Sequence, residues 1–558
     1  MKLFIHVFLS LFLVLLVLSS FWGTFDGFVF AESPPLVVVI GSDTVWTTAV
    51  SPYILTGPLL VSEGATLTIG AGVTVDFNGY HMRVDGVLIA KGSNAQKIHF
   101  TNGEKIDFTS TSVGWNEQTN SGNLIEYSVI DFPVNCTGVA IKVTNSVING
   151  ELTVGDFSRI SDNTILGRTF LSTTGLPYAL YATSSCVVTN NVINGTQATG
   201  QAFAAVYTYC YAVTVWNLSV ISGNNITGSV VAKGSSEVLN NNIVGDVQCW
   251  SATVSGNNIT GKIKGVSCTV SNNAISGGQP TYDWGGRSDD PSSAVSISGY
   301  SSVVENNFIS SPLGGYGILI QEGDTAVSGN VIFDCITGIR AAGDATIAGN
   351  LIKNNGLGIA IGNIAFSGFN DHNYGSGDVI IRDNTITNNG NGISGGNGGS
   401  ATIERNSITN CTQGIYVLLP VIIQNNTISG TQVAVVVGYC SSITLIYNNI
   451  ENYTQNSIWL KTSNNLNASY NWWGTTDTQT INQSIFDFKN DFNLGTVNFT
   501  SFLDEPNPEA ELVSQPTIPE FSSWIILPLL MVLVLIAVVS RKKLMHNVGP
   551  FLSVFRFS

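Results

Sequence analysis

The chain has 558 residues, of which only 11% are charged, and its formal net charge is −15. This acidic balance argues against a nucleic-acid partner, because nucleic-acid binding needs clustered Lys and Arg. The 58 glycines suit a body made of strands and tight corners. A chain of this length could hold several compact domains, but the repeat described below favours one elongated domain.

The first segment, residues 1–31, begins with Met-Lys, continues as an apolar run from Leu3 to about Trp22 and ends at Ala31. This pattern predicts a secretory signal peptide that is cleaved near Ala31. The apolar run is also long enough for an uncleaved signal anchor, and the sequence leaves that alternative open. In both cases we expect the rest of the chain to be exported.

The next segment, residues 32–110, is rich in predicted strands. GATLTIGAGVTVDFNGYHMRVDGVLIAKGSNAQKIHFT (64–101) alternates apolar and polar residues almost throughout, with Gly at the corners. It resembles the first coils of right-handed parallel β-helix repeat proteins of microbial surfaces, in the pectate-lyase-like superfamily. Ala71 stands where such proteins often have Pro. The resemblance implies that 32–110 forms the first coils and caps the open end of the solenoid.

The central segment, residues 111–503, contains a repeat that is clearest from Val327 to Ile450. GNVIFDCITGI, GNLIKNNGLGI, DNTITNNGNGI and RNSITNCTQGI, starting at residues 329, 349, 383 and 405, align without a gap. Each has Asn, Ile two residues later and Gly-Ile at +8 and +9, and apolar residues recur at −3 and −5. Three alternating runs in each period predict three strands per turn, and therefore an all-β, right-handed parallel β-helix.

The repeated asparagine is expected to be structural. Coils stack at about 4.8 Å, so equivalent residues lie over one another, and an amide can bond to the same amide above and below. We assign the Gly at +8 to a corner that needs positive φ or close backbone approach. The anchoring asparagines are Asn330, Asn350, Asn384, Asn406, Asn426 and Asn448; upstream, Asn224, Asn241, Asn257 and Asn273 recur at the shorter spacings of 17, 16 and 16 residues.

Two insertions, 277–293 and 362–378, gather the aromatic, acidic and imidazole groups that catalysis would need. β-helix lyases use clustered carboxylates with a nearby Arg or Lys, and glycosidases need two carboxylates. A solvated turn explains Asp289-Asp290-Pro291 equally well, and the insertions leave different strands three coils apart. The candidate catalytic residues are Asp283, Arg287, Asp289 and Asp290 in the first insertion, and Asp371, His372 and Asp378 in the second.

No cofactor and no metal are expected, because no CxxC motif or Cys/His cluster is present. Opposite charges recur at −2 (Arg382, Glu404) and at −1 (Asp383, Arg405), and they are predicted to stack on adjacent coils.

Eight cysteines in an exported chain suggest disulfides. Cys335 and Cys411 lie three coils, or about 14 Å, apart, twice the distance that a disulfide spans, so both are predicted to be small ladder residues. Other pairs, such as Cys249 with Cys268, stay open. Glycosylation is expected at a few exposed corners among the sequons, which begin at Asn135, Asn194, Asn217, Asn225, Asn258, Asn410, Asn425, Asn452, Asn467, Asn482 and Asn498.

The solenoid is predicted to end in LNASYNWWGTTD (466–477), where Trp472 and Trp473 cover the exposed core. A sugar-stacking role for these tryptophans is the alternative. Residues 504–523 form a Pro- and Glu-rich linker that is expected to lack structure.

The last segment contains an apolar helix, 524–540, and a basic tail, 541–558, which together predict a membrane span with a cytoplasmic end. Pro519-Glu520-Phe521, the helix and the basic cluster resemble the PEF-CTERM sorting signal of archaeal surface proteins. The resemblance implies processing by a sortase-like enzyme, although this tail continues for 15 residues past the basic cluster. The sequence leaves open whether the helix is retained.

The sequence therefore predicts a cell-surface protein that is anchored to the membrane at its C-terminus. Its role would be structural, adhesive or carbohydrate-binding, with polysaccharide or surface-layer components as partners. The alternative is a polysaccharide lyase or glycoside hydrolase that acts through the two insertions, since the fold by itself does not decide function.

Overall fold

The computed structural model describes residues 36–167, 178–202, 205–277, 293–311, 314–362, 377–396, 398–440 and 442–511. The predicted signal peptide, the predicted helix 524–540 and the basic tail lie outside these residues. Within the described ranges, no helix has the length and apolar character needed to cross a bilayer.

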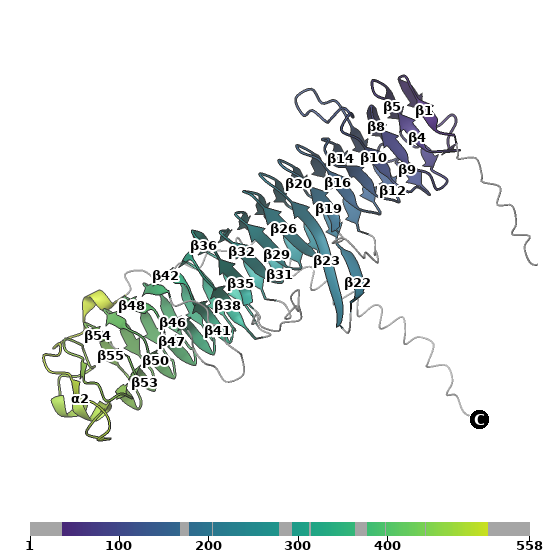
Figure 1. Cartoon of the computed structure of the whole chain (residues 1–558). Coiled ribbons are helices and arrows are strands. Elements are labelled where there is room, and N and C mark those ends of the chain that lie inside the picture. Colours follow the sequence, from purple (N-terminus) through teal and green to yellow (C-terminus); the bar gives the residue numbers. More distant parts are fainter. Residues whose placement is uncertain are drawn as a thin grey trace, which may run out of the picture.

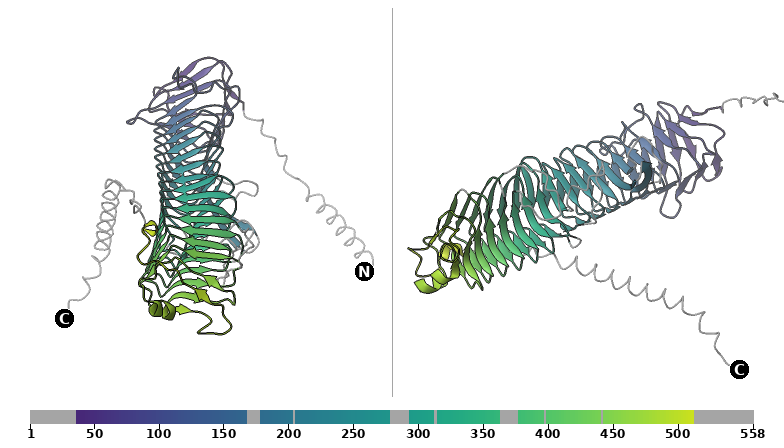
Figure 2. Two further views of the ribbon diagram at one scale, coloured as in Figure 1. Left: turned by 90° about the vertical axis from the view of Figure 1, so that its left-hand side faces the viewer. Right: turned by 60° about the horizontal axis from the view of Figure 1, so that its bottom comes forward.

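The described chain winds into a long solenoid with three parallel sheets, which confirms the predicted parallel β-helix (Figures 1 and 2). We call the sheets A, B and C. One coil runs through β48 (Ser400–Glu404) in sheet B, β49 (Ser407–Thr409) in sheet C and β50 (Gln413–Val417) in sheet A. Each strand pairs in parallel with its equivalent in the next coil, namely β51 (Val421–Gln424), β52 (Thr427–Ser429) and β53 (Val433–Val437).

Sheet A runs along the whole solenoid, from β1 (Val38–Ile40) to β58. Its strands after residue 130 are β13 (Val134–Cys136), β16 (Leu152–Val154), β19 (Tyr178–Ala182), β22 (Thr196–Ala202), β23 (Ala205–Val215), β26 (Ser229–Lys233), β29 (Val247–Trp250), β32 (Ile263–Val266), β35 (Ser293–Ser298), β38 (Tyr316–Ile320), β41 (Thr337–Ala341), β44 (Leu357–Ile361), β47 (Asn391–Gly395), β50, β53, β56 (Asn456–Leu460) and β58 (Ile485–Phe486). Beside it in sheet B lie β27 (Glu237–Leu239), β36 (Ser302–Glu305), β39 (Asp324–Ser328), β42 (Asp344–Ala348), β45 (Asp378–Arg382) and β54 (Ile443–Ile446).

The core is a continuous column of aliphatic side chains. Ile403, Ile408 and Ile415 point inward from the three strands of one coil and are fully buried. The first coils belong to the same column, because β10 (Ile106–Phe108) pairs with β13. A single coil buries too few of these side chains to offset its ordering entropy, so stability comes from stacking.

The predicted asparagine ladder is confirmed at the corner between sheets B and C. In a typical step, both the backbone N–H and the Nδ2 group of Asn384 donate to Oδ1 of Asn406, at 3.1 and 2.9 Å. Asn406 repeats both bonds to Asn426 and also donates to the carbonyl of Ile381. In the described ranges the ladder joins Asn163, Asn191, Asn224, Asn241, Asn257, Asn273, Asn307, Asn330, Asn350, Asn384, Asn406, Asn426, Asn448 and Asn471.

A shorter ladder runs along the corner between sheets C and A. The backbone N–H of Cys335 donates to Oδ1 of Asn355, and that of Asn355 donates to Oδ1 of Asn389. Cys335 and Cys411 are both free thiols in this column, as predicted.

Each ladder asparagine follows a residue with positive φ, for example Gly329, Asp383 and Arg405 (φ 64°, 58° and 49°). This left-handed residue turns the chain between the two strands. The prediction for the Gly at +8 was half right. Gly358 lies inside β44 and not at a corner, but a β-carbon there would come within 2.4 Å of the carbonyl oxygen of Gly392, so close backbone approach does require glycine.

A hairpin that the sequence did not reveal projects from the solenoid where sheet C leads into sheet A. β22 pairs antiparallel with the first part of β23, and the rest of β23 joins the parallel sheet (Figure 1).

The C-terminal end is closed by residues beyond the last full coil. Trp473 is buried in the core and meets Phe499 edge to face, as predicted for a cap, and helix α2 (Thr478–Ser484) contacts β56 and β58. Trp472 instead remains partly exposed and donates to Glu451.

The expectation of an unstructured linker is wrong for residues 504–511. Asn507 exchanges two hydrogen bonds with Asn449, and its Nδ2 group donates to Asn425, so this stretch is fixed against sheet C. The backbone and side chain of Asn507 thus provide hydrogen-bond partners for the side chains of Asn449 and Asn425, which would otherwise bond to water.

Candidate functional site

The two insertions leave from opposite edges of sheet A. Insertion 277–293 leads from β34 (Ala274–Ser276) of sheet C into β35, and insertion 362–378 leads from β44 into β45 of sheet B. Asp283, Arg287, Asp289, Asp290, Asp371 and His372 lie outside the described residues, so the catalytic hypothesis for them stays a prediction. The structure adds that β35 and β44, the strands next to the two insertions, belong to the same sheet.

Asp378 is the one candidate that the structure describes. Its backbone N–H donates to Oδ1 of Asp344 at 2.8 Å, and its own Oδ1 accepts from the hydroxyl of Ser400 at 2.8 Å. Asp246 accepts the backbone N–H of Lys262 in the same way. These contacts join consecutive coils, and a catalytic role of Asp378 stays a prediction.

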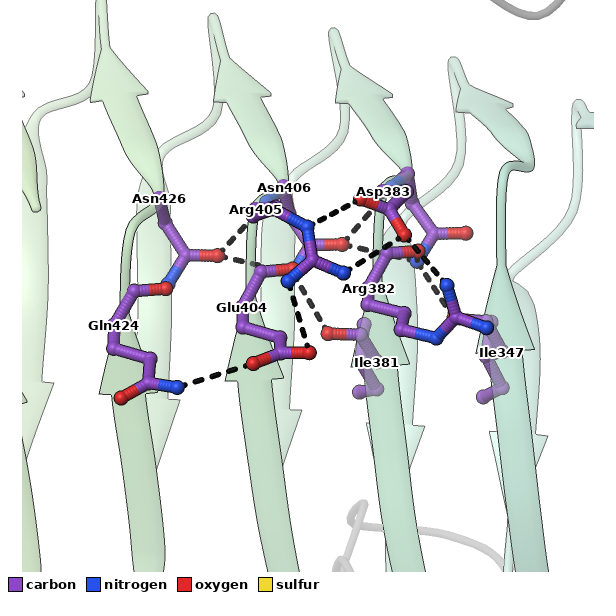
Figure 3. Close-up of polar contacts among 10 residues, drawn as sticks. Ile347, Ile381, Arg382, Asp383, Glu404, Arg405, Asn406, Gln424 and Asn426 are labelled. Carbon is purple, nitrogen blue, oxygen red and sulfur yellow. Dashed lines mark hydrogen bonds and ion pairs between the residues drawn. The ribbon is translucent and has the colours of Figure 1, made fainter. Parts of the chain in front are cut away.

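The charges at positions −2 and −1 form a network across three coils (Figure 3). Asp383 accepts from Arg382 at 2.8 Å and from Arg405 at 2.9 Å, and Arg405 also reaches Glu404 at 3.2 Å. Gln424 continues the chain by donating to Glu404. Partial burial raises the pKa of Asp383. The hydrogen bonds and positive charges of Arg405 and Arg382 lower this pKa by more, so the net pKa lies below its ordinary value. The charges neutralise one another, so this network is structural.

The outward side of sheet A presents a different set of residues. Equivalent outward positions stack in register from coil to coil, and we call this line the central row. Its residues are Val231, Gln248, Lys264, Ser296, Leu319, Arg340, Ala360, Ser394, Tyr416, Val436, Trp459 and Phe486.

One aromatic cluster lies beside the row, at the C-terminal ends of β23, β26 and β29. Lys233 is directly in register with Trp250, and Trp216 follows β23 one coil earlier. The Nζ atom of Lys233 lies 4.4 Å from the centroid of the Trp216 ring and 4.8 Å from that of Trp250. The lysine is thus held between two indole faces that solvent still reaches.

A second cluster lies in the last coils of the same sheet. The Nζ atom of Lys461 lies 4.2 Å from the ring centroid of Trp459 and 5.9 Å from that of Tyr416, and Phe486 packs edge to face on Trp459. Val436 fills the space between the rings. Seven coil steps separate Trp250 from Tyr416 along the sheet, or roughly 34 Å at about 4.8 Å per step.

From Ser296 to Ser394, the central row is buried although it points away from the core. Leu319 is fully buried, Arg340 is 2% exposed and Ser394 is 4% exposed. Leu319 does not belong to the interior cluster. The guanidinium of Arg340 lies 5.7 Å from the ring centroid of Tyr316. This stretch begins on β35, which follows insertion 277–293, and ends on β47, one coil after insertion 362–378 leaves β44.

Charge is distributed unequally between the sheets. The described strands of sheet A from β13 to β58 contain Lys233, Lys264 and Arg340 and no Asp or Glu, and Lys461 follows β56 directly. The neighbouring strands of sheet B contain acidic residues, namely Glu237, Glu305, Asp324, Asp344, Asp378 and Glu404. In a chain with a net charge of −15, sheet A is therefore the cationic and aromatic side.

Sequence reasoning missed this face. A signal existed: Trp216, Lys233 and Trp250 are each 17 residues apart, which is the spacing from Asn224 to Asn241. Residues that recur at the coil period must stack, but their outward direction becomes visible only once the register is known. Within the described ranges, no group of three or more His, Cys, Asp or Glu side chains is placed to bind a metal ion.

The chain was compared with known proteins. Residues 258–419 and 372–474 match the model of a family described as "Right handed beta helix region", which agrees with the fold seen here. No curated protein matches the chain.

Several solved structures are similar. The periplasmic alginate epimerase AlgG is 14% identical, with a TM-score of 0.22 and coverage of 64% of this chain and 81% of that one. The A-module of the Azotobacter vinelandii mannuronan C-5 epimerase AlgE4 is 13% identical, with a TM-score of 0.22 and coverage of 71% and 88%. The PL6 family alginate lyase AlyGC is 9% identical, with a TM-score of 0.20 and coverage of 80% and 100%. At these values the similarity assigns no activity to this chain.

Proposed function

We propose that this protein binds an acidic polysaccharide along the outward face of sheet A. The observation that supports the proposal is the joint occurrence, on one sheet, of two aromatic–lysine clusters and the absence of acidic residues from its described strands between β13 and β58. Everywhere else we expect the acidic surface to repel such a polymer.

The chemistry of the face suits a sugar chain with carboxylate or sulfate groups. Indole and phenol rings offer flat apolar surfaces for the faces of sugar rings. Lys233 and Lys461 offer charges that their aromatic neighbours already hold in place, so little side-chain entropy is lost on binding. Ten coil steps lie between Lys233 and Trp459, or roughly 48 Å at about 4.8 Å per step, so a long polymer could engage both clusters at once.

The test is a binding titration of the purified full chain with polygalacturonate as the acidic probe and a neutral β-glucan as the control. We expect the acidic polymer to bind at least about tenfold more tightly at low salt, and the difference to shrink as salt rises. Equal affinity for the two polymers, or no binding by either, would contradict the proposal.

A second candidate is that the protein also modifies the polymer that it binds. Arg340 favours this reading, because a nearly buried guanidinium on the outward side of sheet A lies where both insertions leave the sheet. The acidic candidates for such a reaction are the insertion residues named above. Incubation with polygalacturonate or alginate should then release reducing or unsaturated ends, or change the uronate stereochemistry, and Asp289→Ala or Asp371→Ala should abolish the change. An unchanged polymer would leave binding as the function.

The cellular setting completes the proposal. The predicted export signal, the apolar segment 524–540 and the PEF-CTERM-like motif support a location at the cell surface, with the solenoid outside. Membrane attachment and processing by a sortase-like enzyme follow from the same segments. Mass spectrometry of the C-terminus of the native protein tests this, because a retained helix and a cleaved tail differ in mass.

A further inference from the structure

Two of the free thiols meet across adjacent coils. Cys249 points inward from β29, and Gly265 on β32 is its partner in the next coil. Cys268 lies three residues after Gly265, at the corner before β33 (Thr269–Ser271). Both cysteines are essentially buried.

The space above Gly265 is shared by the two side chains. A β-carbon at Gly265 would lie 3.1 Å from Sγ of Cys249 and 3.3 Å from Cβ of Cys268. The two thiols are close enough for each to shift the pKa of the other, and the S–H of Cys268 donates to the carbonyl of Val266 at 3.4 Å. Glycine at 265 therefore leaves the room in which the two sulfurs approach one another.

Other cysteines are placed differently. The thiol of Cys186 donates to the carbonyl of Gly155, that of Cys335 to the carbonyl of Phe333 and that of Cys411 to the carbonyl of Thr409. These three thiols donate to backbone carbonyl oxygens and not to a second sulfur atom.

We propose that Cys249 and Cys268 form a disulfide that staples two adjacent short coils. In the bond-forming reaction, two S–H bonds break and one S–S bond forms. The two protons and two electrons pass to a small-molecule disulfide, the oxidant, whose S–S bond breaks to give two thiols. Because the thiols are buried in the finished solenoid, the reaction takes place while the chain folds.

Within the folded pair, Cys268 is the more acidic thiol. The hydrogen bond from Cys249 lowers the pKa of the Cys268 thiol, and the same bond, together with burial, raises the pKa of Cys249. The thiolate is the reactive form in disulfide exchange.

The consequence is mechanical. The bond would close a loop that begins at Cys249, beside Trp250, so it would fix the position of one wall of the first aromatic–lysine cluster. In the cell the bond needs an oxidising compartment and so rests on the export proposed above, whereas in vitro it does not.

The experiment uses the full-length chain, refolded with a mixture of oxidised and reduced glutathione. Free thiols are then alkylated under denaturing conditions, and the protein is digested and mapped without reduction. We expect one cross-linked peptide pair that contains Cys249 and Cys268, with the other six cysteines alkylated. The oxidised protein should unfold at a higher denaturant concentration than the reduced protein.

Matched variants separate this pair from general oxidation. Cys249→Ser should abolish the cross-link and leave Cys268 alkylated, whereas Cys335→Ser should leave the cross-link intact. A natively folded wild-type protein with all eight cysteines alkylated, or with Cys249 joined to another cysteine, would overturn the proposal. That mapping does not depend on polysaccharide binding, so the two proposals fail independently.

Discussion

The asparagine ladder and the central row of sheet A run parallel along the same solenoid, yet they differ in almost every respect. The ladder keeps one residue type from Asn163 to Asn471, is buried, and bonds each coil to the next. The central row changes from lysine to serine, arginine, tyrosine and tryptophan. The first line bonds the coils to one another, whereas the second is buried from Ser296 to Ser394 and has solvent-accessible residues beside the two aromatic–lysine clusters.

The difference follows from where each line points. An amide that faces the inside of a corner has no water to bond to, so its only partners are the identical groups above and below. A side chain on the outward face of a sheet has no such requirement. Variation between coils is therefore a guide to the functional side of a solenoid, and uniformity is a guide to its scaffold.

The largest effect should come from removing one amide of the ladder. Asn406→Ala leaves the backbone N–H and Nδ2 groups of Asn384 without their acceptor, removes the Nδ2 donor from the carbonyl of Ile381, and leaves Oδ1 of Asn426 with only the backbone N–H of residue 406. Buried unpaired groups cost about 1–3 kcal/mol each, so we expect a loss of about 3–5 kcal/mol in the free energy of unfolding. Denaturant-induced unfolding measures it.

A matched control lies on the outside of the same solenoid. Asn242 belongs to an exposed row in sheet C, where its Nδ2 group donates to Asn225 and its Oδ1 accepts from Asn258. Since water can replace those bonds, Asn242→Ala should cost less than about 0.5 kcal/mol. Equal losses for the two variants would show that burial is not what distinguishes the ladders.

The sequence predicted the ladder because the ladder is uniform. Counting residues aligns Asn384 with Asn406 in consecutive repeats. Two amides that stack in this way are expected to bond to each other, and they do. Asn307 was missed because insertion 277–293 interrupts its period. The left-handed residue before each ladder asparagine was missed because Gly, Asn, Asp, Arg and Tyr all occupy that place, so no residue type marks it.

The outward face of sheet A could not be predicted for the opposite reason. Trp250 and Trp459 have no common neighbours in the sequence, and only the register shows that they share one face. The fold of residues 504–511 also escaped prediction, since Asn507 bonds to residues more than 50 positions earlier in a segment whose composition is typical of a linker.

The second prediction concerns binding rather than stability. Trp250→Ala removes one of the two ring faces around Lys233 and should weaken the binding of polygalacturonate by about tenfold, which is about 1.4 kcal/mol. Tyr470→Ala is the control, because this exposed aromatic residue lies at the corner between sheets B and C. Isothermal titration calorimetry of both variants measures the change, and equal losses would exclude sheet A as the binding face.

The third prediction concerns salt. Lys233→Ala removes one cation from sheet A, so the slope of the logarithm of the binding constant against the logarithm of salt concentration should fall by about one unit or less. Lys353→Ala, on β43 (Leu351–Lys353) of sheet C, removes the same charge from another face and should leave the slope unchanged. Titrations at several salt concentrations compare the two. A smaller slope for Lys353→Ala than for Lys233→Ala would contradict the proposed face.

The smallest effect should come from the charge network of Figure 3, which lies on the scaffold side of the comparison. Asp383→Asn tolerates the left-handed backbone and keeps a hydrogen-bonding side chain, but it removes the charge that Arg405 and Arg382 pair with.

The pKa of Asp383 is lower in the folded chain than in the unfolded chain. The contribution of this carboxylate to the free energy of unfolding is therefore complete above the unfolded value of about 3.9 and is lost as pH falls through the folded pKa. Because the carboxylate is partly exposed, the contribution at pH 7 should be only about 0.5–1 kcal/mol and should decrease in high salt. Unfolding free energies of wild type and variant should therefore differ at pH 7 and converge as the pH falls below the folded pKa of Asp383, while Asp324→Asn, at an exposed position, should change little in either range. A gap between wild type and Asp383→Asn that persists at low pH would mean that Asp383 acts through packing, as the ladder asparagines do, and not through its charge.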